Sequence, residues 1–313
     1  MSIPKIVVLQ TNDLPEAAVE ALGRQFDVRR IPEEGAAREQ FLEAYGTSVR
    51  AIAGTGKGRV DAQLLARLPS LEIISVSSAG LDAIDTDAVA ARSIPIYNTS
   101  TILADDVADL ALWLILGTTR SLAQADRFVR NREWRKDNYY PLGKTIHGMK
   151  IGVLGLGHIG KAIARRLEIS GAELGYTGRT RQSVVGYTFF ADLVDLAQWS
   201  DLLVVSCPAT AATYHLVNAE VLRALGPNGI LVNIARGNII DETALIDALE
   251  KGEIFGAGLD VFEYEPEVPQ ALIDSKRTIL LPHIGSATHG TRTRMWENMV
   301  AVLEQHFELA ERG

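Results

Sequence analysis

The stretch that decides the fold is "KIGVLGLGHIGKAIARRL", residues 150–167. It has the pattern of an apolar strand, a glycine-rich turn and a helix, and Gly155, Gly157 and Gly160 fit G-x-G-x-x-G. The first glycine permits the tight turn, the second lets the backbone approach a pyrophosphate, and the third lets helix and strand pack closely. The start of the helix then offers free N–H groups and the positive end of its dipole to phosphates. The stretch predicts a dinucleotide-binding unit.

The segment "GYTGRTRQ", residues 175–182, closes the next strand and contains no acidic residue. In NAD-preferring folds an Asp or Glu about 20 residues beyond the first glycine binds the ribose 2′-hydroxyl. Thr177 stands at that place, followed by Arg179, Thr180 and Arg181. The arginine fork suits phosphate oxygens, so the segment predicts a preference for NADP(H). The alternative is that both arginines are solvated surface charges.

Apolar runs that alternate with helical patterns extend on both sides of this unit. Strands are expected near residues 5–10, 49–56, 71–80, 172–178, 201–208, 229–237, 255–262 and 278–285. Such alternation predicts parallel sheets. We therefore expect an α/β protein with two Rossmann-like, doubly wound parallel-sheet domains and a cleft between them.

The domain limits follow from the order of these patterns. Residues 1–100 together with 284–313 are expected to form a discontinuous substrate-binding domain, and residues 101–283 the NADP-binding domain. The last helical pattern has no strand after it, so we expect it to return and pack on the first domain.

Composition narrows the partners and the setting. The 313 residues carry a net charge of -8, which argues against nucleic acid or an anionic membrane as the main partner. Cys207 is the single cysteine, and "MSIPKIVVLQ" lacks the pattern of a signal peptide, so a cytoplasmic protein is expected. No His, Cys or acidic cluster has metal-ligand spacing, so no metal is expected.

Three later segments place polar side chains directly after predicted strands. They are "NIARGNIIDETAL" (233–245) with Arg236, "GAGLDVFEYEPEVP" (256–269) with several acids, and "LLPHIGSATHG" (280–290) with His283. Ligands of open parallel sheets bind at the carboxyl ends of the strands. These segments are therefore the candidates for chemistry.

These motifs, together with "SSAGLDAID" (77–85) and "LADDVADLALWLIL" (103–116), are similar to those of a known protein family. The chain resembles the D-isomer-specific 2-hydroxyacid dehydrogenase family, and within it the NADPH-dependent glyoxylate/hydroxypyruvate reductase branch. The resemblance implies reduction of small 2-oxo acids such as glyoxylate and hydroxypyruvate to D-2-hydroxy acids.

The resemblance implies that Arg236, Glu265 and His283 are catalytic, and elementary chemistry agrees. Arginine holds a 2-oxo acid carboxylate through paired charge-assisted hydrogen bonds and polarises the keto oxygen. Histidine donates a proton to that oxygen, and a neighbouring carboxylate orients the ring and favours its charged form. The family's glutamate directly precedes a proline, as Glu265 does. Glu263 and Glu267 are therefore expected to be solvated, and His215 is expected at the surface.

Further site residues also follow from the resemblance. Asp260 is expected to contact the nicotinamide amide, the N–H groups of Ala79 and Gly80 the substrate carboxylate, and Gly54 is expected to line the substrate pocket. A homodimer is expected, in which Trp134, Tyr139 or Tyr140 reaches the partner's site. The remaining coenzyme contacts are expected from Leu156, His158, Ile159, Cys207, Pro208, Ile234, Ala235, Ser286 and Val107.

Several alternatives stay open. A D-lactate or 3-phosphoglycerate dehydrogenase would share the catalytic set, but the NAD-type acid is missing at Thr177. The loop "EYEPEVP" (263–269) also resembles plant hydroxyphenylpyruvate reductases, which keeps an aromatic 2-oxo acid open as the substrate. A dinucleotide-sensing binding protein is the alternative outside the enzymes, because a fold alone does not imply catalysis.

Overall fold

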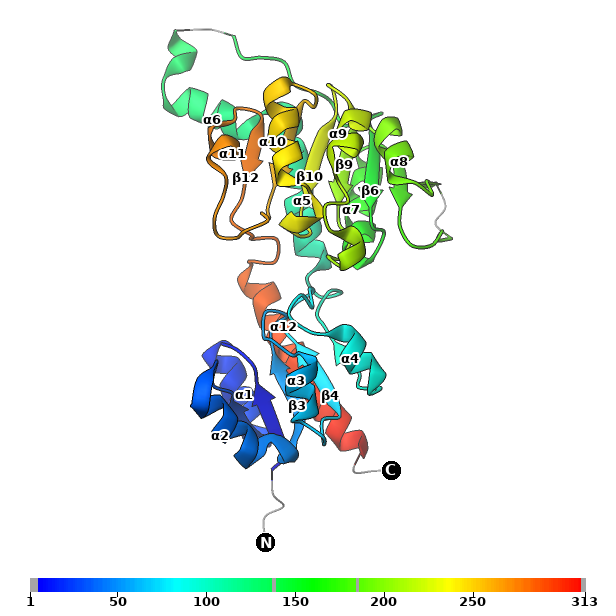
Figure 1. The fold of residues 1–313 in the computed structure, drawn as a ribbon. Helices are drawn as coiled ribbons and strands as arrows, with labels where there is room; N and C mark the ends of the chain where they lie inside the picture. Colours follow the sequence, from blue (N-terminus) through cyan, green and yellow to red (C-terminus); the bar gives the residue numbers. More distant parts are fainter. Residues whose placement is uncertain (1–4, 137–138, 184–185, 311–313) are drawn as a thin grey trace. The chain divides into compact units, whose positions relative to one another are not determined.

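The computed structural model describes residues 5–136, 139–183 and 186–310. The chain divides into two compact units, unit 1 (Met1–Leu103 with Thr288–Gly313) and unit 2 (Ala104–Ala287). The predicted limits lay at 100/101 and 283/284. Each unit has its own parallel sheet with helices packed on it, so the predicted α/β fold class of two parallel-sheet domains is confirmed (Figure 1). The cleft stays a prediction.

Unit 1 contains a five-stranded sheet in the order β2-β1-β3-β4-β5, and all its pairings are parallel. Two of these strands lie outside the predicted apolar runs, because β2 is polar and β5 has only two residues. The strands are β1 (Val7–Gln10), β2 (Asp27–Arg30), β3 (Val49–Gly54), β4 (Ile73–Val76) and β5 (Ile96–Tyr97). The helices are α1 (Glu16–Gln25), α2 (Gly35–Tyr45), α3 (Ala62–Ala66), α4 (Thr86–Ala91) and α12 (His289–Ala310).

Helix α12 packs into unit 1 although more than 180 residues separate it from β5. Met299, Leu303 and Phe307 share a buried apolar cluster with Val8 of β1 and Ile73 of β4. The buried Ser75 hydroxyl also donates a hydrogen bond to the carbonyl oxygen of Met299, at 3.1 Å. The last helix therefore completes the core of the first sheet.

Unit 2 contains a seven-stranded parallel sheet in the order β12-β11-β10-β9-β6-β7-β8. The order reverses between β6 and β9, and ligands of such sheets bind at this switch point. The strands are β6 (Lys150–Leu154), β7 (Glu173–Thr177), β8 (Thr188–Phe189), β9 (Leu202–Val205), β10 (Ile230–Asn233), β11 (Gly256–Leu259) and β12 (Thr278–Leu280).

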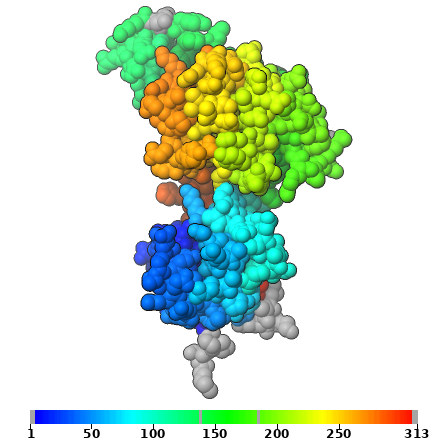
Figure 2. Space-filling view, viewed as in Figure 1, coloured from blue at the N-terminus to red at the C-terminus, as the bar shows by residue number. Residues whose placement is uncertain are grey.

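Helices cover both faces of this sheet (Figure 1). Helices α5 and α7 pack side by side, and α8, α9 and α10 form a second layer. No helix in the described ranges has the length and apolar character needed to cross a membrane. The helices are α5 (Ala104–Arg120), α6 (Leu122–Arg130), α7 (His158–Ile169), α8 (Leu193–Trp199), α9 (Ala219–Leu225), α10 (Glu242–Lys251) and α11 (Gln270–Asp274). Helix α6 and the short turn of Glu133–Arg135 after it lie at the periphery of unit 2 (Figure 2).

Candidate active site

The glycine-rich turn after β6 has the geometry of a phosphate cradle. Gly155 has a φ of +97°, and a Cβ there would lie 2.6 Å from the Cα of Cys207. A Cβ at Gly160 would overlap the carbonyl oxygen of Gly155, whereas one at Gly157 would have no neighbour within 4 Å. Gly157 also precedes α7 without a side-chain cap. The turn therefore leaves open space in front of the N–H groups at the start of a helix, which suits a pyrophosphate.

The loop after β7 is tied to this turn. The phenol of buried Tyr176 accepts a hydrogen bond from the N–H of Gln182 (2.7 Å) and donates one to its carbonyl oxygen (3.1 Å). The Gln182 amide donates to the carbonyl oxygen of Leu156 at 2.9 Å. Sequence reasoning missed Gln182, because nothing in its type or spacing marks it.

The arginines of that loop are exposed. Thr177 is buried at the end of β7, and its carbonyl oxygen accepts the N–H of Gly155 at 2.9 Å. Neither Arg179 nor Arg181 forms an ion pair with an acidic side chain in the part of the chain that the structure describes. The loop therefore presents two guanidinium groups that no acidic side chain in the described ranges neutralises.

The predicted proton donor and its carboxylate meet after β11 and β12. Nδ1 of His283 lies 2.7 Å from Oε2 of Glu265. His283 has a φ of +53°, and its N–H donates to the carbonyl oxygen of Asp260 at 2.8 Å. Because Nδ1 is engaged by Glu265, Nε2 is the ring nitrogen left to face a substrate.

Asp260 holds the turn that carries His283. Its carboxylate accepts hydrogen bonds from the N–H groups of Ile284 (2.8 Å) and Gly285 (2.9 Å), and it is 1% exposed. Burial raises the pKa of Asp260, and these two N–H groups partly offset that effect. Asp260 therefore positions the histidine loop, and its expected nicotinamide contact stays a prediction.

The loop after β10 brings Arg236 next to the Glu265 loop. The side chain of buried Asn233 accepts from the N–H of Ala235 (3.0 Å) and donates to the carbonyl oxygen of Arg236 (2.9 Å). The backbone of Gly237 lies against the peptide that joins Phe262 to Glu263. The three predicted catalytic residues thus follow three neighbouring strands, β10, β11 and β12.

Comparisons with known proteins show the family to which this chain is similar. The family model described as D-isomer specific 2-hydroxyacid dehydrogenase, NAD binding domain, matches residues 112–285. Glyoxylate/hydroxypyruvate reductase A of Arabidopsis thaliana is 46% identical over 267 residues, which is 85% of each chain. The chain belongs to the D-isomer specific 2-hydroxyacid dehydrogenase family.

Two further similar proteins extend the likeness over nearly the whole chain. Hydroxyphenylpyruvate reductase of Plectranthus scutellarioides is 42% identical over 286 residues, 91% of each chain. An NADPH-dependent glyoxylate/hydroxypyruvate reductase of Sinorhizobium meliloti, solved with NADP and malonate, is 40% identical with a TM-score of 0.87. That likeness covers 97% of this chain and 94% of the other.

Two expectations from the sequence, that Glu263 is solvated and that His215 is a surface residue, were wrong. Glu263 is not a solvated loop acid, because its side chain is 9% exposed and Oε1 lies 2.9 Å from Nε2 of His215 and 3.3 Å from the hydroxyl of Tyr214. His215 is likewise half-buried in this contact and is not a simple surface residue. The two partners are 48 positions apart in sequence, so only the fold reveals the pair. Glu267 is exposed, as predicted.

The remaining coenzyme candidates lie around the glycine-rich turn and the strand ends. Cys207 packs against Gly155, and burial raises the pKa of its thiol to about 11, so the thiol stays protonated at neutral pH. Val107 lies beside Gly285. Among the described His, Cys, Asp and Glu side chains, no group of three or more is arranged to hold a metal ion. Ile234 and Ala235 are buried, Ile159 and Ser286 are half-buried, and His158 and Pro208 are exposed.

Within unit 1 the predicted substrate loops lie together. The Ser78 hydroxyl accepts a hydrogen bond from the N–H of Gly56 (2.7 Å) and donates one to the carbonyl oxygen of Gly80 (2.9 Å). Gly54 ends β3, and its carbonyl oxygen accepts from the loop after β4. In the described ranges, neither the N–H of Ala79 nor that of Gly80 donates to a protein acceptor, so both suit an anion.

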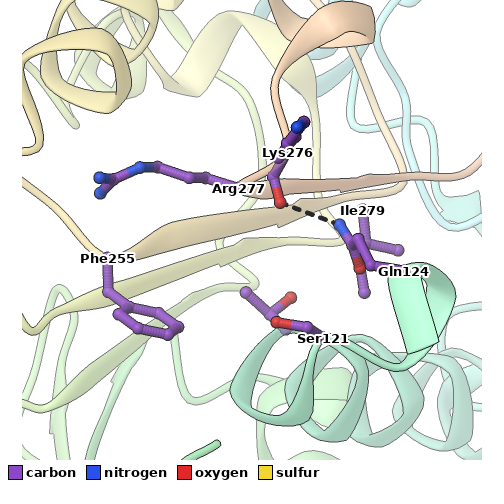
Figure 3. A pocket seen from close by; sticks show the side chains of 7 residues that line it. Ser121, Gln124, Phe255, Lys276, Arg277 and Ile279 are labelled. Atoms are coloured by element: carbon purple, nitrogen blue, oxygen red, sulfur yellow. Dashed lines mark hydrogen bonds between the residues drawn. The ribbon is translucent and has the colours of Figure 1, made fainter. Parts of the chain in front are cut away.

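A small pocket elsewhere in unit 2 is distinct from this site (Figure 3). It has a volume of about 220 Å³ and lies at the starts of β11 and β12, whereas Asp260 and His283 follow their ends. Gln124 closes one side by donating to the carbonyl oxygen of Lys276 at 3.1 Å. The pocket contains none of the predicted site residues.

Gly237→Ala should damage both stability and turnover. A Cβ at this position would overlap the carbonyl carbon of Phe262, so the Arg236 and Glu265 loops must separate. Overpacking of this kind costs about 1–3 kcal/mol in the free energy of unfolding. Thermal melting and steady-state kinetics check this, with Gly23→Ala as the control, because a Cβ there meets nothing within 4 Å and Gly23 lies in α1, outside the predicted coenzyme and catalytic residues. Equal melting temperatures for both variants would contradict it.

Proposed function

We propose that this protein reduces small 2-oxo acids, glyoxylate and hydroxypyruvate, to D-2-hydroxy acids with NADPH. The observation that carries the proposal is the bond between His283 Nδ1 and Glu265 Oε2, beside the loop of Arg236. The similarity to reductases named for glyoxylate and hydroxypyruvate, one of them solved with NADP, supports the substrate class and the coenzyme.

Each residue of the site has a task in this reaction. NADPH, when bound, supplies the hydride. His283, oriented by Glu265, donates a proton from Nε2 to the keto oxygen, which becomes the hydroxyl group of the product. Arg236 holds the substrate carboxylate and polarises the same keto oxygen. The N–H groups of Ala79 and Gly80, with the Gly54 turn, are the further candidates to bind the substrate carboxylate.

The coenzyme is held by residues whose geometry fits NADPH. The turn from Gly155 to Gly160 receives the pyrophosphate, because it is open at Gly157 and lies at a helix start. Thr177, Arg179, Thr180 and Arg181 receive the 2′-phosphate, since no acid stands there to repel it. The other candidates, which line the nicotinamide and its ribose, are Leu156, His158, Ile159, Cys207, Pro208, Ile234, Ala235, Asp260, Ser286 and Val107.

Arg179→Ala should raise KM for NADPH by about 10- to 100-fold and leave KM for NADH within about twofold. A charge-assisted hydrogen bond contributes about 1.5–3 kcal/mol, and each 1.4 kcal/mol corresponds to tenfold in affinity. Arg181→Ala should act in the same direction. Arg223→Ala is the control, because that exposed arginine lies on α9 and not in the loop after β7. Equal changes for both coenzymes would show that the arginines do not read the 2′-phosphate.

The substrate class is tested by offering glyoxylate, hydroxypyruvate, pyruvate and hydroxyphenylpyruvate with NADPH and following NADPH oxidation. The highest kcat/KM is expected for glyoxylate or hydroxypyruvate, and D-glycerate is the expected product of the latter. The similarity to hydroxyphenylpyruvate reductase makes reduction of the aromatic acid the second candidate function. Coenzyme binding without turnover of any of the four acids would contradict the proposal and favour a dinucleotide sensor.

We also propose that the protein is a cytoplasmic homodimer. Several large apolar side chains on α5, on α6 and after α6 are exposed in unit 2. Tyr140 is held within its own chain, because its hydroxyl donates to the carbonyl oxygen of Ser121 at 3.0 Å. Trp134 and Tyr139 are the better candidates to reach a partner's site. The exposed residues are Trp113, Leu116, Leu122, Val129, Trp134, Tyr139 and Leu142.

A further inference from the structure

We infer that His215 and Glu263 form a positioning pair that fixes the Arg236 and Glu265 loops relative to each other. The inference rests on the proposed function, because it concerns the same catalytic site. Neither residue is a reacting group. Each acts through the backbone and side chains that it holds.

His215 connects two loops at once. Its N–H donates to the carbonyl oxygen of Asn238, two residues beyond Arg236, at 2.9 Å. Its ring Nε2 lies 2.9 Å from Oε1 of Glu263, two residues before Glu265. The residue has a φ of +49°, a conformation that is uncommon outside glycine. Strain of this kind persists only where the surroundings enforce it, and here both contacts do so.

Glu263 is held from three directions. Its Oε1 lies 3.3 Å from the Tyr214 hydroxyl, and the Tyr214 ring stacks on the His215 ring with centroids 3.9 Å apart. Its N–H donates to Oε1 of buried Glu242 at 3.1 Å. Within the described ranges the His215 ring is the only basic group within 4.0 Å of the Glu263 carboxylate. A carboxylate that is 9% exposed needs such partners, so the pair holds the loop in one place.

The pair is connected to His283, the proton donor, through the backbone of Phe262 and the side chain of Glu265. The N–H of Phe262, directly before Glu263, donates to Oε1 of Glu265 at 3.3 Å. The other oxygen of that carboxylate, Oε2, holds Nδ1 of His283 at 2.7 Å. A shift of Glu263 therefore moves the N–H that orients Glu265, and Glu265 in turn orients His283. A misplacement of about 1 Å can cost about 100-fold in rate.

The test compares variants that break or keep the pair. His215→Asn tolerates the positive φ but is too short to keep the ring contact, and Glu263→Ala removes the carboxylate. Each should lower kcat for hydroxypyruvate about 10- to 100-fold, with KM for NADPH within about twofold of the natural protein. Glu263→Gln keeps an acceptor for His215 and should restore most of kcat. Glu267→Ala is the control, because Glu267 lies in the same loop and is exposed.

The double variant decides whether the two residues act as one unit. His215→Asn combined with Glu263→Ala should lose no more kcat than the worse single variant, because residues in one interaction are not additive. Additive losses would overturn the pairing. Single variants that match Glu267→Ala, or that lose NADPH binding and thermal stability together with kcat, would overturn the positioning role. If Glu263→Ala does not fold, His215→Asn and Glu263→Gln still give the comparison. Absence of turnover in the natural protein would instead count against the proposed function.

Discussion

His283→Asn should lower kcat for hydroxypyruvate reduction by about 10²- to 10⁴-fold, because it removes the general acid. Asparagine tolerates the φ of +53° at this position, so the loop keeps its backbone conformation. The hydrogen bond from the N–H of residue 283 to the carbonyl oxygen of Asp260 does not involve the side chain and should remain. KM for NADPH should therefore stay within about twofold. Steady-state kinetics at saturating NADPH measure the effect.

His289→Asn is the matched control for this variant, since His289 is exposed at the start of α12. It should leave kcat within about twofold. A His283→Asn enzyme that retains turnover at the level of this control would show that another group donates the proton. Glu265→Gln should have a smaller effect than His283→Asn, because it keeps a hydrogen-bond partner for Nδ1 and leaves the proton donor in place.

Arg236→Gln should reduce kcat/KM for hydroxypyruvate by about 10²- to 10³-fold. The guanidinium is expected to bind the carboxylate and to stabilise the negative charge that develops on the keto oxygen, and removing one such donor costs about 2.7–4 kcal/mol. Arg236→Lys should recover only part of the loss, because an ammonium group lacks the planar fork of donors. The measurement is the full dependence of rate on 2-oxo acid concentration.

Arg223→Gln, on α9, is the control for the loss of one positive charge from unit 2. It should leave kcat/KM unchanged. If Arg236→Gln changed only KM for NADPH and left the 2-oxo acid parameters intact, the arginine would belong to the coenzyme site instead.

The parts of this site that were predictable from the sequence are those that local chemistry marks. Gly155 and Gly160 are required by close backbone approaches, and the pattern of glycines between a strand and a helix reveals them. His283 and Glu265 follow strands of a parallel sheet, and the resemblance of their motifs singles them out. Short or polar strands such as β2 and β5 were missed, because their pairing depends on neighbours and not on their own apolar character.

Contacts between distant loops were not predictable. The pairing of His215 with Glu263 and the tie from Gln182 to Leu156 depend on the order of strands in the sheet, which brings separate loops to one edge. In the sequence, a loop carboxylate that is buried by a distant partner cannot be distinguished from a solvated one. Glu263 was therefore expected to be solvated, like Glu267, although the fold holds it through His215, Tyr214 and Glu242.

The most direct test of the central claim is the ratio of kcat/KM for NADPH to that for NADH, measured with hydroxypyruvate as the second substrate. Thr177 stands where an NAD-preferring fold has an acidic residue, and Arg179 and Arg181 follow it. We therefore expect turnover with NADPH and a ratio well above about 10. A ratio at or below about 1 would contradict the account, because Arg179 and Arg181 would then be surface charges and the lactate-like alternatives would stand again.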